Sequence, residues 1–302
     1  MRILASDGME KNAVAALRDQ GHEVVEQFYA PEELAEQVKN FDVLVVRSAT
    51  KVRTPIIDAA LETGRLKLII RGGVGIDNID HEYAESKGIK VMNTPRASSN
   101  AVAELAMAHM LSCARFVSIA GHTMREGKWE KKIYNGIEVH GKTLGIVGYG
   151  RIGQSLGRMA IAMGMEVVAY DVFHVPGIEN EHMHYVELDE LYAVSDFISL
   201  HVPSLEGQPL VNAETIAKMK DGVIIVNTSR GTNIDEAALL EALNSGKVRA
   251  AGLDVWSSEP ATDNPLLSHP HVSCTPHIGA ATAEAQGRIG AEIVDIIGKF
   301  FA

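Results

Sequence analysis

Short apolar runs alternate with longer segments of mixed polarity through the first third of the chain. Runs rich in Ile, Leu and Val are typical of buried parallel strands, and the segments between them have the length of helices. The expected strands are Ile3-Leu4-Ala5, Glu23-Val24-Val25, Val43-Leu44-Val45-Val46, Leu68-Ile69-Ile70 and Lys90-Val91-Met92. The expected helices lie near 11–20, 32–39, 55–63 and 82–87. This alternation predicts a doubly wound parallel sheet covered by helices.

A second series of strand-like runs begins at Leu144. Its members are 144–147, 166–170, 197–200, 223–227, 249–253 and 272–273. Two further helices are expected at 98–116 and 282–300, and the second returns to the first domain after the last strand. We therefore predict an α/β protein of two doubly wound domains: residues 1–96 with 282–302, and residues 97–281.

The first strand of the second series ends in a glycine-rich turn. Gly148 suits a tight turn, Gly150 lets a pyrophosphate approach the backbone, and Gly153 lets the next helix pack on the strand. Asp171 ends the following strand, at about the 20-residue spacing typical of a carboxylate that binds ribose hydroxyls. Strand, turn, helix, strand and acid together indicate a dinucleotide site. Because Asp171 would repel a 2′-phosphate, NAD is favoured over NADP.

Composition narrows the class of partner. The 302 residues carry a net charge of −11, which argues against nucleic acid or an anionic membrane as the main partner. Two cysteines indicate no disulfide framework. The chain enters a strand at its first residues, and its apolar runs fall short of the roughly 18 residues of a membrane span. We expect a cytoplasmic protein.

Three consecutive strands of the second series each precede a residue suited to catalysis: Arg230, Glu259 and His277. The carboxyl ends of parallel strands meet at one sheet edge, where ligands bind. Histidine is suited to exchange a proton with a substrate hydroxyl, and a carboxylate on its other nitrogen stabilises the imidazolium. Arginine grips a carboxylate with two hydrogen bonds. We assign His277 as acid/base, Glu259 as its partner and Arg230 as substrate anchor; the alternative for Arg230 is a surface ion pair.

His182 and His184 flank Met183 without a nearby cysteine or acid cluster. That pattern lacks the spacing of a tetrahedral metal site, and we expect a solvated loop and no metal.

Together the glycine motif, Arg230-Gly231, Asp254-Val255, Glu259-Pro260 and 276–280 resemble the D-isomer-specific 2-hydroxyacid dehydrogenases over nearly the whole chain. Within them, the segments 46–52, 71–78, 93–95 and 127–130 resemble the D-3-phosphoglycerate dehydrogenases of serine synthesis. The resemblance implies a Rossmann-type NAD-binding domain in the centre, a flavodoxin-like substrate (lid) domain, and a homodimer to which the helix near 98–116 contributes.

The resemblance also implies roles by position. Those expected to contact NAD are Gly148, Gly150, Arg151, Ile152, Gly153, Asp171, Val202, Thr228, Ser229, Arg230, Asp254, His277, Gly279 and Ala280. Those expected to contact substrate are Arg47, Arg71, Gly73, Val74, Gly75 and Lys131. Arg47 and Arg71 match arginines near a substrate phosphate, and Lys131 falls where some relatives use an arginine of the partner subunit. The alternative for each basic residue is a surface salt bridge.

Some positions depart from the family pattern. Val74 and Val202 stand where many relatives have threonine, so two hydroxyl contacts to the cofactor are missing. Trp256 replaces a common phenylalanine and narrows the expected pocket. Because the chain ends at Ala302, we expect the short form without carboxyl-terminal regulatory domains, and activity without serine feedback.

The expected reaction is NAD-dependent oxidation of 3-phospho-D-glycerate to 3-phosphohydroxypyruvate. The three catalytic residues do not specify the substrate's side chain, so a glyoxylate, hydroxypyruvate or D-lactate reductase is an alternative. A different class, the NAD-sensing binding modules of transcriptional corepressors, uses the same fold.

Overall fold

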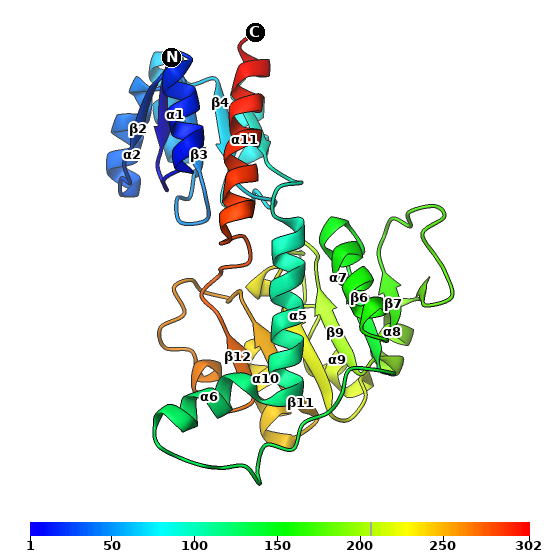
Figure 1. Ribbon diagram of the computed structural model, residues 1–302. Coiled ribbons are helices and arrows are strands. Elements are labelled where there is room, and N and C mark those ends of the chain that lie inside the picture. Colours follow the sequence, from blue (N-terminus) through cyan, green and yellow to red (C-terminus); the bar gives the residue numbers. More distant parts are fainter. Residues whose placement is uncertain (206) are drawn as a thin grey trace. The chain divides into compact units, whose positions relative to one another are not determined.

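The computed structural model describes residues 1–205 and 207–302. It divides into two compact units (Figure 1). Unit 1 comprises Met1–Ser98 and Ala280–Ala302, and unit 2 comprises Ser99–Gly279. The predicted architecture of two doubly wound α/β domains is confirmed in both units.

Unit 1 is built on a parallel five-stranded sheet. Its strands are β1 (Arg2–Ala5), β2 (Glu23–Glu26), β3 (Val43–Val46), β4 (Leu68–Arg71) and β5 (Lys90–Asn93). They lie in the order β2-β1-β3-β4-β5, which is the flavodoxin-like order. All four residues of β3 are buried, as expected for a strand covered on both faces.

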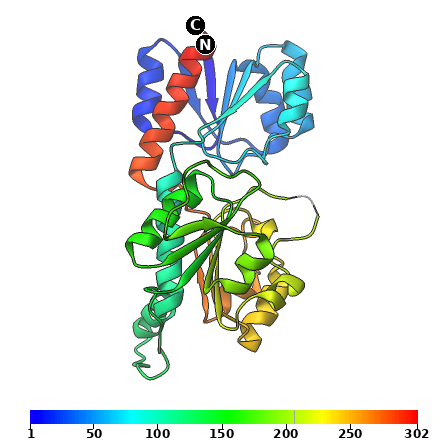
Figure 2. The same cartoon turned by 90° about the vertical axis from the view of Figure 1, so that its right-hand side faces the viewer.

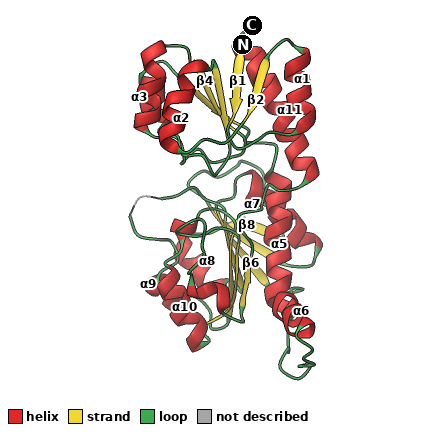
Figure 3. Ribbon diagram, turned by 90° about the vertical axis from the view of Figure 1, so that its left-hand side faces the viewer, coloured by secondary structure: helices red, strands yellow, loops and turns green. Residues whose placement is uncertain are grey.

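Helices cover both faces of this sheet (Figure 3). They are α1 (Lys11–Asp19), α2 (Pro31–Gln37), α3 (Thr54–Thr63), α4 (His81–Ser86) and α11 (Ala283–Phe300), with a 3-10 turn at Val38–Asn40. The last helix, α11, lies beside α1 although the two are far apart in sequence (Figure 2). Its residues Ile289, Ile293 and Ile297 are buried against the sheet, so the apolar spacing seen in the sequence marks the face that packs.

Unit 2 contains a parallel seven-stranded sheet. Its strands are β6 (Thr143–Val147), β7 (Glu166–Tyr170), β8 (Met183–Tyr185), β9 (Phe197–Leu200), β10 (Val223–Asn227), β11 (Val248–Leu253) and β12 (Val272–Cys274). The order is β12-β11-β10-β9-β6-β7-β8. From β6 onward this is the 3-2-1-4-5-6 order of a Rossmann fold, with β12 added at one edge. The sheet reverses its strand order between β6 and β9, where Rossmann folds bind dinucleotides.

The helices of unit 2 also lie on both faces of its sheet (Figure 3). They are α5 (Ser99–Arg115), α6 (Val117–Arg125), α7 (Arg151–Ala162), α8 (Leu188–Val194), α9 (Ala213–Lys218) and α10 (Glu236–Ser245), with 3-10 turns at Gly231–Asn233 and Pro265–Ser268. Helices α5 and α7 share one apolar core with the sheet, whereas α8, α9 and α10 share another. Among the described residues no single helix has the length and apolar character to span a membrane; α5 and α6 reach both only as a pair bent by 67°.

Two elements differ from the sequence prediction. The segment expected as a solvated loop around Met183 contains the edge strand β8, because Met183 pairs with Val167 and is buried to 1% exposure. Helix α6 was not predicted. The chain turns at Phe116, whose φ of 58° interrupts the helical path and separates α6 from α5.

The strands of unit 2 end in one row. Tyr170, Val147, Leu200, Asn227, Leu253 and Cys274 are register partners from β7 to β12, and each is the last residue of its strand. Since the strands are parallel, all six loops that follow leave the sheet at the same edge. The predicted site residues of this domain therefore begin side by side.

Candidate active site

The glycine turn after β6 is sterically required at two positions. Gly148 has a φ of +93°, and a Cβ there would lie 2.6 Å from the carbonyl oxygen of His201. A Cβ at Gly153 would lie 2.3 Å from the carbonyl oxygen of Gly148. Both distances are too short for a side chain, so these glycines let the turn, the β9 loop and α7 pack closely.

Gly150 has a different role. It is the N-cap of α7, no side chain caps the helix there, and a Cβ at this position would meet nothing within 4 Å. The open space lies next to the first backbone N–H groups of α7, including those of Arg151, Ile152 and Gly153. A helix N-terminus without a cap binds anions through these N–H groups and its dipole. The site therefore fits a pyrophosphate.

Asp171 lies beside this turn at the end of β7. Its Oδ2 accepts a hydrogen bond from the backbone N–H of Tyr149 at 2.7 Å, and its Oδ1 accepts one from Phe173 at 3.0 Å. The carboxylate is thus fixed next to the pyrophosphate position. Val172 and Phe173 after it are exposed and offer no cation for a 2′-phosphate. This geometry fits NAD.

Two buried asparagines shape the turn that carries Arg230. Asn227 accepts hydrogen bonds from the backbone N–H and hydroxyl of Ser229 at 3.0 and 2.8 Å, and donates to the carbonyl of Arg230 at 2.8 Å. Asn233 donates to Ser229 Oγ and to the carbonyl of Val202. Neither asparagine was predicted from the sequence. For Asn227 the available signal was a polar amide at the end of the apolar strand β10.

Thr228 begins this turn. Its hydroxyl is buried and has no hydrogen-bond partner among the described residues. A buried hydroxyl without a protein partner is a candidate for binding a ligand. Thr228 lies next to the end of β10, and its contact to the nicotinamide side of the cofactor stays a prediction.

Arg230 and Glu259 are brought together by a close backbone approach. Arg230 donates through Nη1 to the carbonyl of Ser229 at 2.6 Å. A Cβ at the next residue, Gly231, would lie 1.9 Å from the carbonyl carbon of Trp256. The turn that carries Arg230 therefore packs directly on the loop that carries Glu259.

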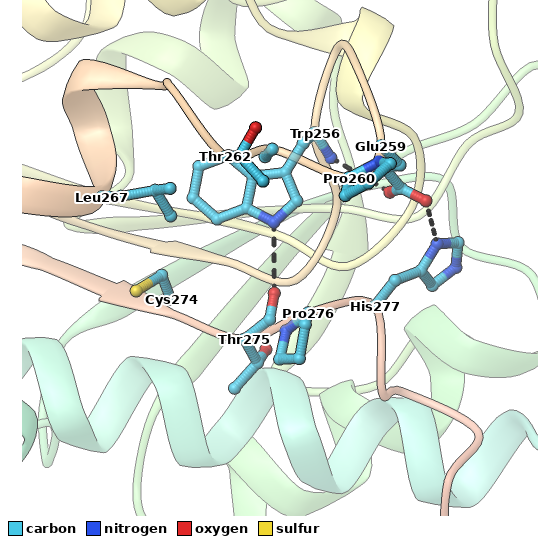
Figure 4. Close-up of a pocket in the computed structure, with 10 residues that line it drawn as sticks. Trp256, Glu259, Pro260, Thr262, Leu267, Cys274, Thr275, Pro276 and His277 are labelled. Carbon is cyan, nitrogen blue, oxygen red and sulfur yellow. Dashed lines mark hydrogen bonds and ion pairs between the residues drawn. The ribbon is translucent and has the colours of Figure 1, made fainter.

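His277 and Glu259 form the predicted pair. His277 Nδ1 lies 2.8 Å from Glu259 Oε2, and the carboxylate can only accept, so Nδ1 carries the hydrogen (Figure 4). Burial raises the pKa of Glu259, but the hydrogen bond and charge of His277, the backbone N–H of Trp256 and the charge of Arg230 together hold it below its usual value. Glu259 is therefore ionised at neutral pH and fixes the imidazole through Nδ1.

The backbone around His277 is held by Asp254. His277 has a φ of +54°, which is uncommon for a residue with a side chain. Its N–H donates to the carbonyl of Asp254 at 2.8 Å, while Ile278 and Gly279 donate to the Asp254 carboxylate at 2.8 and 2.9 Å. Asp254 is only 1% exposed. Its predicted contact to NAD, like those of Gly279 and Ala280, stays a prediction.

A pocket of about 450 Å³ opens beside the pair (Figure 4). Trp256 lies along it, with Nε1 donating to the carbonyl of Thr275 at 3.2 Å. Leu267 and Cys274 close the side opposite His277. Trp256 is the residue that departs from the family's common phenylalanine, and its indole forms one wall of this pocket.

The substrate-binding candidates of unit 1 also lie at strand ends. Val46, the last residue of β3, pairs with Arg71 in β4, so Arg47 and Arg71 leave neighbouring strands at one edge. Asp7 accepts from the backbone N–H of Arg47 at 2.6 Å and fixes that loop. A Cβ on Gly73 would lie 1.4 Å from Arg71 Nη1, so the guanidinium occupies the space that only glycine leaves open.

The remaining candidates of unit 1 continue this loop. Val74 is exposed, and its carbonyl accepts a hydrogen bond from Asn93 Nδ2. Gly75 is half-buried. The structure therefore brings the loop 73–75 and both arginines to the same edge of the first sheet.

Lys131 is not brought to the site within one chain. It is exposed, and the carbonyl of nearby Asn135 accepts from Arg249 Nη2 at 2.7 Å. Arg249 lies at the start of β11, so this segment is at the amino ends of the strands, opposite Arg230 in unit 2. This position does not contradict the prediction for Lys131, because that prediction assigned Lys131 to the site of a partner subunit.

Comparison with known proteins places the chain in a family. The family model of the D-isomer specific 2-hydroxyacid dehydrogenase NAD-binding domain matches residues 107–279. The chain is 51% identical to hydroxypyruvate reductase of Thermotoga maritima, across 99% of this chain and 97% of that protein. It is 46% identical to D-3-phosphoglycerate dehydrogenase of Methanocaldococcus jannaschii, across 99% of this chain but 57% of that protein.

A solved structure agrees. D-lactate dehydrogenase from Aquifex aeolicus, complexed with NAD and lactic acid, superposes with a TM-score of 0.86 at 30% identity, over 100% of this chain and 95% of that one. The chain therefore belongs to the D-isomer specific 2-hydroxyacid dehydrogenases, and its cofactor is NAD. The resemblance inferred from the sequence motifs is confirmed.

The lowered pKa of Glu259 gives a pH prediction. Because ionised Glu259 is favoured in the folded protein, it stabilises the fold at pH values above the usual pKa of glutamate. This stabilisation is lost as the pH falls through the lowered pKa of Glu259. Glu259→Gln keeps the shape but cannot stabilise protonated His277. We expect kcat/KM for oxo-acid reduction to fall roughly 10–100-fold at pH 7.5, and the acidic limb of its pH profile, where Glu259 takes up a proton, to disappear.

The matched control is Glu241→Gln, an exposed glutamate on α10. It should leave the profile unchanged. A Glu259→Gln enzyme with the wild-type profile would contradict the assigned role of the carboxylate.

Proposed function

We propose that the chain interconverts 3-phospho-D-glycerate and 3-phosphohydroxypyruvate with NAD. The observation that carries this substrate is the pair of arginines, Arg47 and Arg71, at the ends of neighbouring strands in unit 1. Two guanidinium groups at one sheet edge match a phosphate better than an uncharged hydroxymethyl group. The likeness to D-3-phosphoglycerate dehydrogenase of M. jannaschii supports the same assignment.

In this proposal the two units divide the work. Unit 2, built from residues 99–279, binds NAD at its glycine turn and Asp171. Unit 1 binds the substrate's tail through the arginines. In its loop 73–75 the N–H of Gly73 donates to the carbonyl of Arg71 at 2.9 Å, so the N–H groups of Val74 and Gly75 are the ones proposed to bind the substrate carboxylate.

The chemistry follows from the geometry of the pair. Bound NAD supplies the hydride acceptor, and NADH the donor, at the nicotinamide ring. During oxidation His277 takes the C2 hydroxyl proton at Nε2, since Nδ1 donates to Glu259. The positive imidazolium that forms is stabilised by the ionised Glu259 carboxylate. During reduction the same nitrogen returns the proton to the carbonyl oxygen.

Arg230 orients the substrate for this step. Its guanidinium belongs to a turn fixed by Asn227 and packed against the Glu259 loop. A bidentate hold on the carboxylate presents C2 to the cofactor on one side and the oxygen to His277 on the other. This arrangement selects one enantiomer because the three groups at C2 are bound separately.

Hydroxypyruvate reduction is the second candidate. It is favoured by the 51% identity to hydroxypyruvate reductase of T. maritima, which extends over nearly both full chains. The catalytic residues serve both reactions equally, because the two substrates differ only in the phosphate. Which substrate is preferred therefore depends on the residues of unit 1 proposed to bind that phosphate.

Replacing both Arg47 and Arg71 with alanine separates the two candidates. Loss of two charge-assisted contacts should lower kcat/KM for 3-phosphohydroxypyruvate about 100-fold and leave hydroxypyruvate and glyoxylate within about threefold. Initial rates of NADH oxidation with the three oxo acids provide the measurement.

Lys67→Ala is the control, since it removes a positive charge at the opposite, amino end of β4. Two results would contradict the phosphorylated substrate. One is an equal loss of kcat/KM on all three oxo acids in the double variant, and the other is a higher kcat/KM of the wild-type enzyme for hydroxypyruvate than for 3-phosphohydroxypyruvate. No turnover of any oxo acid would favour an NAD-sensing binding module.

We also propose that the chain is a homodimer that uses α6 and the segment after it. Val117, Met124, Trp129 and Ile133 are large apolar residues, each at least 58% exposed, and exposed apolar clusters mark interfaces. Lys131, in the same segment, falls where some relatives use an arginine of the partner subunit, which supports the proposal.

Sedimentation equilibrium should give twice the chain mass of 32.6 kDa for the wild type. Trp129→Glu should weaken association at least about tenfold by placing a charge in an apolar contact. Val172→Glu, at a position that is also highly exposed but lies outside this cluster, should not. A monomeric wild type at micromolar concentration would contradict the proposal.

A further inference from the structure

A buried histidine outside the catalytic set contacts the strand that leads to His277. His109 lies on α5 and is 3% exposed. Its Nδ1 is 3.0 Å from Ser273 Oγ, and its Nε2 is 2.9 Å from Thr275 Oγ1. Ser273 and Thr275 lie within and just after β12, two residues apart. A single ring thus contacts two side chains on the same face of the strand end that supplies the catalytic loop.

The directions of these hydrogen bonds follow from the chemistry of the groups. Thr275 donates its hydroxyl hydrogen to Asp254 Oδ1 at 2.6 Å, and a hydroxyl has one hydrogen. It must therefore accept from His109, so Nε2 of His109 carries a hydrogen.

Burial lowers the pKa of His109, although the charge of Asp254 partly opposes this, and the ring is neutral at neutral pH. Nδ1 is then an acceptor, and Ser273 donates to it. The hydrogen bonds therefore run in one direction: Ser273 donates to His109, His109 donates to Thr275, and Thr275 donates to the Asp254 carboxylate. Asp254 is the titratable residue that acts on His109 in this cluster.

The fold makes room for this contact. A Cβ on Gly252 in β11 would lie 2.5 Å from the Cβ of His109, so α5 can approach the sheet at this level only because β11 has a glycine there. The same carboxylate that ends the series also accepts from the N–H groups of Ile278 and Gly279. The hydrogen bonds from His109 through Thr275 to Asp254 therefore connect α5 to the backbone of Ile278 and Gly279, which follow His277 in the chain.

We infer that His109 is a positioning residue, which directs the Thr275 hydroxyl onto Asp254 and thereby holds the loop that places His277. His277 has two restraints: Glu259 fixes its ring, and Asp254 fixes its backbone. His109 acts through the second. This inference rests on the proposed acid/base role of His277 but not on the identity of the substrate.

The first test measures the loop directly, without cofactor or turnover. In His109→Leu, which keeps the volume but not the donor, hydrogen exchange of the peptide covering 275–281 should be about fivefold faster. His109→Gln, which retains a donor toward Thr275, should restore most of the protection. Met110→Leu, the adjacent substitution on α5, should leave the exchange unchanged.

The second test concerns the chemical step. For His109→Leu, kcat per NADH-binding site should fall roughly five- to tenfold while KM values stay within about twofold. The primary isotope effect with NADH deuterated at the transferred position should rise. A histidine that only fills the core would lower the fraction of folded enzyme without changing either quantity per binding site.

Thr275→Val completes a double-mutant cycle with His109→Leu, and His109→Phe, which also lacks the ring donor, takes the place of His109→Leu should that variant not fold. If His109 acts through Thr275, the double variant should lose no more kcat than the stronger single variant. Additive losses, or unchanged exchange at 275–281 in His109→Leu, would overturn the inference. Wild-type enzyme without oxo-acid turnover would overturn the proposed function instead, since the exchange result is independent of it.

Discussion

The shared register of six parallel strands in unit 2 is the constraint on which the site depends. Their last residues form one row from Tyr170 to Cys274, and the next residue of each strand begins a loop of the site. Asp171 and Gly148 begin the two loops that fit NAD, while Thr228, Asp254 and Thr275 begin those that carry Arg230, Glu259 and His277. A slip of register at β10, β11 or β12 would separate these three side chains.

Buried polar groups then convert a row of strand ends into a defined geometry. Asn227 and Asn233 fix the Arg230 turn, and Asp254 fixes the backbone of His277. These groups are nearly inaccessible to solvent, so their hydrogen bonds compete little with water. The arginines expected to meet the substrate, Arg47, Arg71 and Arg230, are in contrast partly exposed. The site therefore consists of reactive side chains on loops whose backbones are held from beneath.

Much of this arrangement could be predicted from the sequence, for a physical reason. Parallel strands covered on both faces are continuous apolar runs, and β3, β9 and β10 were predicted with their observed bounds. Because ligands bind at the carboxyl ends of such strands, the residues after them were the natural candidates. Glu259 and His277, eighteen positions apart, indeed form a hydrogen bond at 2.8 Å.

What the sequence did not reveal depends on long-range contacts. His109 lies in an apolar helix and resembles any core residue until β12 is placed beside it. Asn227 looks like the end of a strand, and β8 is too short and exposed to be distinguished from a loop. The Arg71 guanidinium against Gly73 likewise requires coordinates, since a loop sequence does not specify where a long side chain packs.

The most direct test of the account is the rate of hydride transfer in His277→Ala, measured in a single turnover with the enzyme saturated by NADH. The account predicts NADH binding within about threefold of wild type, because the glycine turn and Asp171 are untouched, and a rate of hydride transfer lower by roughly 1,000-fold. A variant that transfers hydride at close to the wild-type rate would show that another group exchanges the proton, and the assignment of His277 would be wrong.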